Sequence, residues 1–64
     1  MLEALNLKNN IKVVIEHDTK VGFYLFAYPI GGQKPIADYF CFTLEEAFAT
    51  AERHFQVKKD EYAR

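Results

Sequence analysis

Two histidines and one cysteine are the side chains with the most evident reactivity in this sequence. His17 is followed by Asp18, and general acid–base catalysis often uses a carboxylate to orient an imidazole. Adjacent residues at the end of a strand point to opposite sides, so we do not expect these two to act together. His54 lies near the end of a predicted helix, where an imidazole interacts favourably with the helix dipole. We therefore predict structural roles for both histidines and no catalytic residues.

The remaining candidates for chemistry are Cys41 and the glycine pair Gly31-Gly32. As the only cysteine, Cys41 can form no internal disulfide and no thiolate-based zinc site. It falls inside a predicted strand, where a free thiol is usually a small buried apolar side chain. The glycines lack the spacing of a phosphate-binding loop and do not precede a helix. We expect no metal, no cofactor and no enzymatic activity.

The clearest structural element is a helix over residues 43–56, TLEEAFATAERHFQ. Thr43 and Glu46 have the spacing of a capping box, in which each side chain satisfies a free backbone N–H group. At about 100° per residue, the apolar residues fall on one stripe of this helix. The members of this stripe are Leu44, Ala47, Phe48, Ala51 and Phe55. The pattern is typical of a helix that lies on a core.

Three strands are predicted before the helix, over residues 11–17, 21–28 and 36–42. The first alternates β-branched and polar residues, and a short polar turn joins it to the second. Two prolines and two glycines between positions 29 and 35 form a loop before the third strand. We therefore predict an α+β fold in which a three-stranded antiparallel meander carries one C-terminal helix on one face.

The chain of 64 residues has the length of a single domain. Outside the predicted sheet and helix, we interpret residues 1–10 as an N-terminal arm. Residues 58–64 are mostly polar and are predicted to fray, with docking of Tyr62 on the core as the alternative.

One helix covers only one face of a sheet, so the aromatic residues on the other face need a partner or a cover. Alternation places Tyr24, Phe26, Tyr28 and Phe40 on the face away from the helix. Contiguous exposed aromatic side chains are typical of an interface. We predict that these four residues bind a second copy of the chain or another protein, unless the N-terminal arm or the tail covers them.

The charge balance argues against two other kinds of partner. The net charge is −1, so the chain offers no basic surface for nucleic acid or for an anionic membrane. The apolar run over residues 21–28 is much shorter than the ~20 residues of a membrane helix. The N-terminus does not have the pattern of a signal peptide, and no disulfide is possible. We therefore expect a cytoplasmic protein.

The junction between the last strand and the helix resembles that of a group of small bacterial proteins of uncharacterised function. Ala37-Asp38-Tyr39 followed by Thr43-Leu44-Glu45-Glu46-Ala47 fits their D-Y-x-x-x-T-L-E-x-A pattern, and Phe55-Gln56-Val57 fits their F-x-V helix end. The resemblance covers the second half of the chain. It implies a β-β-β-α fold and no known activity.

The same helix start, T-x-E-E-A at Thr43–Ala47, also resembles the domain of HicB-type antitoxins. That family carries a P-D-L-P-G turn before its third strand, where this chain has Pro29-Ile30-Gly31-Gly32-Gln33. This resemblance implies an antitoxin-like partner of a small toxin. A second alternative is a single-stranded nucleic-acid accessory protein, because aromatic side chains on a sheet can stack with bases.

Overall fold

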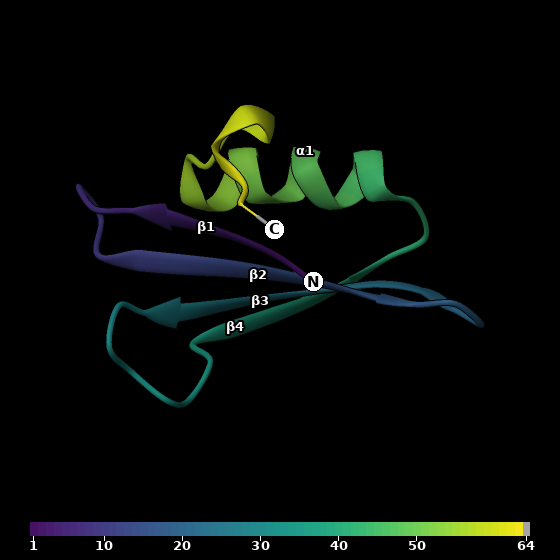
Figure 1. Ribbon diagram of the computed structural model, residues 1–64, viewed down its shortest axis with the longest axis horizontal. Coiled ribbons are helices and arrows are strands. Elements are labelled where there is room, and N and C mark those ends of the chain that lie inside the picture. Colours follow the sequence, from purple (N-terminus) through teal and green to yellow (C-terminus); the bar gives the residue numbers. More distant parts are fainter. Residues whose placement is uncertain (64) are drawn as a thin grey trace.

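The computed structural model describes residues 1–63, which form a four-stranded antiparallel sheet with one α-helix on one of its faces (Figure 1). The strands lie side by side in chain order, β1-β2-β3-β4. The elements are β1 Leu2–Asn6, β2 Ile11–Asp18, β3 Gly22–Pro29, β4 Ala37–Cys41, the helix α1 Leu44–Phe55 and the short 3₁₀ helix η1 Lys59–Glu61. The α+β class, the antiparallel meander and the single packed helix are confirmed.

The predicted number of three strands is wrong, because the segment interpreted as an N-terminal arm contains the edge strand β1. Leu2 pairs with Ile15 and Ala4 with Val13, so these two apolar residues of β1 lie on the core side of the ladder. The sequence LEALN is rich in helix formers, but burial against β2 outweighs this weak local preference. Asn10 has a φ of 59°, a conformation that asparagine tolerates and that closes the tight β1–β2 turn.

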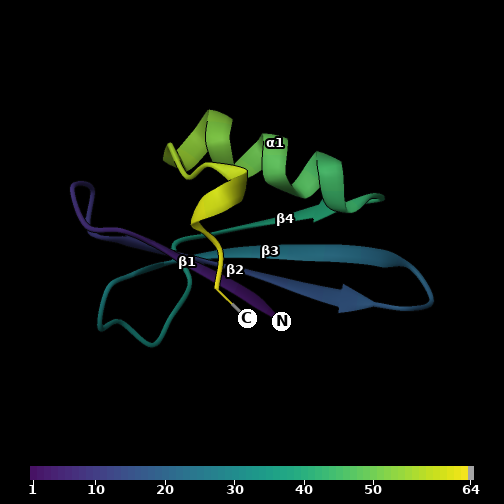
Figure 2. The same ribbon diagram turned by 45° about the horizontal axis from the view of Figure 1, so that its top comes forward.

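The core lies between the helix and one face of the sheet. Alternation along β2 and β3 directs Val13, Ile15, Leu25 and Ala27 towards α1, and each of these side chains is at most 2% exposed. The small residues Ala47 and Ala51 of α1 are fully buried, which lets the helix approach the sheet closely. Figures 1 and 2 show the single helix on one side of the sheet, with no second layer on the other side.

The helix begins and ends where the sequence predicts. The Thr43 hydroxyl oxygen accepts a hydrogen bond from the Glu46 backbone N–H at 3.1 Å, as an N-cap residue does. Gln56 ends the helix in the left-handed conformation, with a φ of 54°. The Asn6 side chain of β1 donates to the Phe55 carbonyl at 3.0 Å and so satisfies one of the last helical acceptors. No helix in the described part of the chain is long and apolar enough to cross a membrane.

Of the two expectations for the tail, fraying or docking through Tyr62, the structure has the docked arrangement for residues 58–63, and position 64 lies outside the described residues. Val57 is fully buried, and the Tyr62 ring packs against Phe48 with 5.1 Å between ring centroids. Glu3 and Ala63 exchange two backbone hydrogen bonds of 3.0 and 2.7 Å, which attach the tail to the outer edge of β1. The apolar residues on either side of η1 therefore dock a segment whose sequence is otherwise polar.

Candidate functional site

The candidate site is the sheet face opposite α1, which we call the outer face. The registers of the four strands define its members, because residues in register share a face and alternate residues change face. Its central part contains Glu3 and Leu5 from β1, Lys12, Val14 and Glu16 from β2, Tyr24, Phe26 and Tyr28 from β3, and Asp38 and Phe40 from β4. The structure thus places the four predicted interface residues on one face.

Five aromatic rings on this face form a continuous series, which we call the aromatic row. Along β3, the Tyr24 and Phe26 ring centroids are 6.3 Å apart, and those of Phe26 and Tyr28 are 6.5 Å apart. The Tyr24 ring centroid also lies 5.3 Å from that of its cross-strand partner Phe40, and the Phe40 and Phe42 ring centroids are 5.1 Å apart. Such spacings are typical of favourable aromatic pairs, so the row is a packed, ordered surface.

Exposure is uneven along the row and is greatest beside β4. Phe26 and Tyr28 are half-buried, while Tyr24 is 37% and Phe40 42% exposed. Val14 lies on the outer face between its cross-strand partners Glu3 and Phe26 and is only 6% exposed. The outer face is therefore closely packed at its centre and most exposed beside β4.

Neither end of the described chain covers the aromatic row. The expected N-terminal arm lies within the sheet as β1, and the tail pairs with the edge of that strand at Glu3. Figure 2 shows the tail and η1 on the helix side of the sheet and beside β1. The aromatic side chains of β3 and β4 thus stay accessible among residues 1–63.

Phe42 is the member of the row that the sequence reasoning did not include. It lies directly before the helix cap, and its side chain is 74% exposed and packs edge-on against Phe40. The signal was present in the alternation of Asp38, Phe40 and Phe42 along and just beyond β4. Because the predicted strand over residues 36–42 includes Phe42, applying the alternation to its last residue would have identified it.

Acidic residues outnumber basic ones on the outer face. The Lys12 ammonium lies over the Tyr28 ring, 5.3 Å from its centroid, and is the only basic group on the central part of the face. Glu16, Glu3 and Asp38 are exposed carboxylates in register with aromatic or apolar residues. Within residues 1–63 the one ion pair joins Lys59 to Glu45 on the other side of the molecule, so the charges of the outer face have no partners there.

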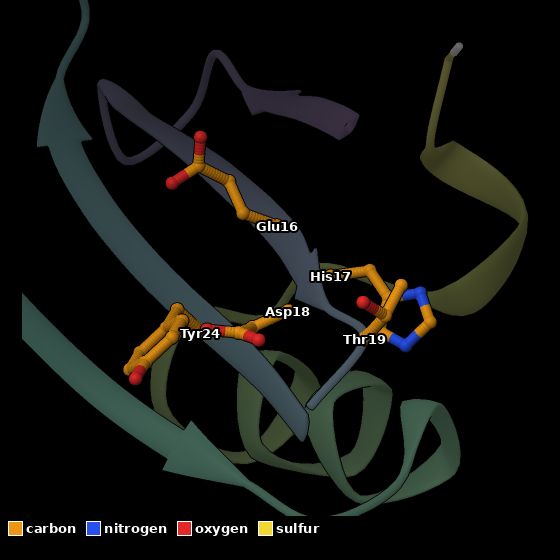
Figure 3. Close-up of a pocket in the computed structure, with 5 residues that line it drawn as sticks. All are labelled: Glu16, His17, Asp18, Thr19 and Tyr24. Carbon is orange, nitrogen blue, oxygen red and sulfur yellow. The ribbon is translucent and has the colours of Figure 1, made fainter. Parts of the chain in front are cut away.

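The His17-Asp18 pair lies at an open hollow of about 490 Å³ at the β2–β3 turn, together with Glu16, Thr19 and Tyr24 (Figure 3). The His17 ring stacks on Phe23, with 4.3 Å between centroids, whereas one Asp18 carboxylate oxygen accepts the Lys20 backbone N–H at 3.0 Å. Figure 3 shows the His17 side chain directed away from Glu16 and Tyr24. Each residue has its own structural partner, and the structure does not bring the two together.

His54 and Cys41 also have structural surroundings. The His54 ring stacks on Tyr39 with 5.0 Å between centroids, and thereby links the end of α1 to β4. Cys41 is buried, and its sulfur lies 3.7 Å from the Thr50 hydroxyl. The part of the chain that the structure describes contains no group of three or more side chains that could hold a metal ion.

A second hollow, of about 330 Å³, lies between α1 and the tail. Leu2, Leu44, Phe48 and Tyr62 line it, and the exposed Glu45–Lys59 ion pair of 3.1 Å lies at its border. Burial raises the pKa of Tyr62 to about 12, with a further contribution from the neighbouring Glu61 carboxylate. The Tyr62 hydroxyl is shielded from solvent and has no hydrogen-bond partner among residues 1–63, so this contact is part of the packing of the tail.

No protein-family model matches this chain, and no curated protein or solved structure shows significant similarity to it. The geometry of the outer face is therefore the basis for a functional proposal.

Proposed function

We propose that this chain is a self-assembling protein module that binds a second copy of itself through the outer face. The observation that carries the proposal is the aromatic row, a continuous series of five rings that no described segment covers. Large contiguous apolar surfaces on small proteins usually mark an interface. Tyrosine and phenylalanine are also enriched in the cores of such interfaces.

The size of the chain supports the same proposal. A domain of about 60 residues buries only ~60% of the surface of its unfolded chain and has little stability to spare. The helix covers one sheet face (Figure 1), and on the other face Tyr24, Phe40 and Phe42 are exposed to water. Burying them against a second copy adds apolar contact that a single chain of this length cannot make by itself.

The charges of the outer face favour a protein partner over nucleic acid. Surfaces that bind single strands combine stacked aromatic rings with a basic groove. Beside the aromatic row, Lys12 is accompanied by the carboxylates Glu3, Glu16 and Asp38. A phosphate backbone would be repelled along most of this face, and the net charge of −1 provides no compensating field.

Sedimentation equilibrium of the wild-type chain and of Phe40→Ser tests the proposal. We expect a monomer–dimer equilibrium for the wild type over roughly 10–500 µM and at least about a tenfold weaker dimer for Phe40→Ser, because the substitution removes an aromatic side chain from both copies of the interface. Leu7→Ser is the matched control, since Leu7 is 77% exposed but lies in the β1–β2 turn. A wild-type chain that stays monomeric, or equal effects of the two variants, would contradict the proposal.

A further inference from the structure

The outer face has an internal symmetry in its charges and rings. In the register of β2 and β3, Lys12 is paired with Tyr28, Val14 with Phe26, and Glu16 with Tyr24. The central pair Val14–Phe26 is apolar, and each outer pair combines one tyrosine with one charged residue. The two charges have opposite sign and lie at equal distances, two residues, from the centre.

Resting on the proposed function, we infer that the second copy binds face to face through a two-fold axis. The axis lies between the two sheets, runs perpendicular to the strands and passes over Val14 and Phe26. This axis reverses the strand direction and stacks β2 on β2 and β3 on β3. Lys12 then faces Glu16 of the second copy, and Glu16 faces its Lys12. The assembly thus gains two intermolecular ion pairs from side chains that have no ionic partner within residues 1–63.

The aromatic and aliphatic side chains match under the same axis. Tyr24 faces Tyr28 of the second copy, and Phe26 faces its own counterpart. Asp38 is in register with Phe26, so Phe40, two residues beyond it, faces the position two residues before Asp38 in the second copy. That position is Ile36, which directly precedes β4 and continues the alternation of the outer face. Phe40 is 42% and Ile36 59% exposed, and both are buried by this contact. Phe40 therefore meets an apolar partner across the interface.

The other two-fold axis that stacks the outer faces runs along the strands and gives poorer complementarity. It places β2 over β3, so that Lys12 faces Tyr28 and Glu16 faces Tyr24 of the second copy. It also places Asp38 over Glu3, because β4 then covers β1. No opposite charges meet in that arrangement. Under the crossing axis the like charges that meet are Asp38 with Asp38 and Glu3 with Glu3, on the edge strands, where water screens them.

The area of the outer face is consistent with a weak dimer. The two eight-residue strands are ~27 Å long and the two five-residue strands ~17 Å, so at a spacing of ~4.8 Å they cover ~420 Å² per copy. Two copies bury ~850 Å², the range of weak, transient interfaces. We therefore expect association at micromolar concentrations, and we expect the two Lys12–Glu16 contacts to determine the orientation of the copies.

Charge reversal tests this orientation by sedimentation equilibrium. Lys12→Glu alone and Glu16→Lys alone each convert both attractive contacts into repulsive ones, and we expect each variant to dimerise at least about tenfold more weakly than the wild type. In an equimolar mixture of the two variants, every glutamate introduced at position 12 meets a lysine introduced at position 16. We expect that mixture to form a heterodimer about as stable as the wild-type dimer.

Three further variants separate the two Lys12–Glu16 contacts from general charge effects. Lys8→Glu and Glu52→Lys are the matched controls, because both positions are exposed and lie off the outer face, in the β1–β2 turn and on α1. We expect wild-type dimerisation from each of them. Asp38→Asn removes a like-charge contact and is expected to strengthen the dimer about twofold or more.

The outcomes distinguish this inference from the proposed function. If Phe40→Ser abolishes the dimer while the charge reversals and their mixture leave it unchanged, the outer face is the interface but the orientation is wrong. If the wild type does not dimerise, both proposals are wrong. A variant that does not fold is recognised by circular dichroism, and the neutral variants Lys12→Gln and Glu16→Gln then replace the reversals, with an expected three- to fivefold weakening.

Discussion

At the scale of single residues, Tyr62 combines a favourable contact with an unfavourable one. Its ring packs on Phe48, but its hydroxyl is shielded from water and has no partner among residues 1–63. A polar group that loses its hydrogen bonds to water without replacement destabilises the folded state by about 1–3 kcal/mol. The tail is therefore held by the ring of Tyr62 in spite of its hydroxyl.

Tyr62→Phe is expected to stabilise the protein. The substitution keeps the contact with Phe48 and removes the unpartnered hydroxyl, so we expect the free energy of unfolding to rise by about 1 kcal/mol. Urea denaturation followed by circular dichroism measures the change. Tyr24→Phe is the matched control, because Tyr24 is 37% exposed on the outer face. Equal shifts of the two variants, or a loss of stability in Tyr62→Phe, would show that the hydroxyl is satisfied in solution.

Tyr62 also makes stability depend on pH in the alkaline range. Its pKa is raised to about 12 in the folded chain, whereas a tyrosine in an unfolded chain titrates near 10. Above pH ~10 the unfolded state loses this proton first, so the free energy of unfolding falls as the pH rises towards 12. We expect the wild type to lose stability relative to Tyr62→Phe over that interval. Parallel curves for the two proteins in urea titrations between pH 9 and about 12 would contradict this assignment.

At the scale of the elements, the start of β3 depends on the absence of a side chain at Gly22. This residue has a φ of 145°, and a Cβ atom there would lie 2.6 Å from the Cys41 carbonyl oxygen and 2.9 Å from the Phe40 ring. The backbones of β3 and β4 thus approach one another closely at the end of the sheet where the aromatic row is most exposed. A larger residue would separate the two strands.

Gly22→Ala is therefore expected to lower the free energy of unfolding by about 2–3 kcal/mol, through backbone strain and the contact with Cys41. Gly31→Ala is the matched control, since Gly31 has a φ of 82° but no atom within 4 Å of the added methyl group. We expect that control to lose only about 1 kcal/mol. Chemical denaturation compares the two, and equal losses would mean that the strands move apart without cost.

The elements that the sequence predicts well are those in which several local signals agree. Thr43, the apolar stripe and Gln56 define the helix, and the β-branched alternation defines β2. The segment of β1 has a conflicting local signal, because its leucines and alanine favour helix while its pairing with β2 requires a strand. The tail docks through contacts of Val57 and Tyr62 with residues far away in sequence, which no local pattern reveals.

At the scale of the whole molecule, the sequence predicts which aromatic residues share the outer face, but it does not predict how exposed they are or how the charges lie around them. Period-two alternation places Tyr24, Phe26 and Tyr28 together whatever covers them. Their exposure depends on whether the N-terminal residues and the tail lie in the sheet, over it or away from it. The symmetric placement of Lys12 and Glu16 becomes visible only once the β2–β3 register is known.

The pairing of Glu3 with Ala63 brings the two ends of the fold together, because the first strand and the last described residues are direct neighbours (Figure 2). A circular permutant should therefore fold. Joining the two ends with a short glycine-rich linker and opening the chain between Gly31 and Gly32 leaves every strand and α1 intact.

We expect the permutant to show the circular dichroism of the parent and to lose no more than about 1–2 kcal/mol in denaturation. A chain opened within β2, between Val13 and Val14, is the control and is expected not to fold. In the permutant β4 and α1 precede β1 along the chain, and the loop between β3 and β4 is no longer needed as a covalent connection. A permutant that folds would show that the contacts between the strands and α1 specify the architecture, and that the order of these elements along the chain can change.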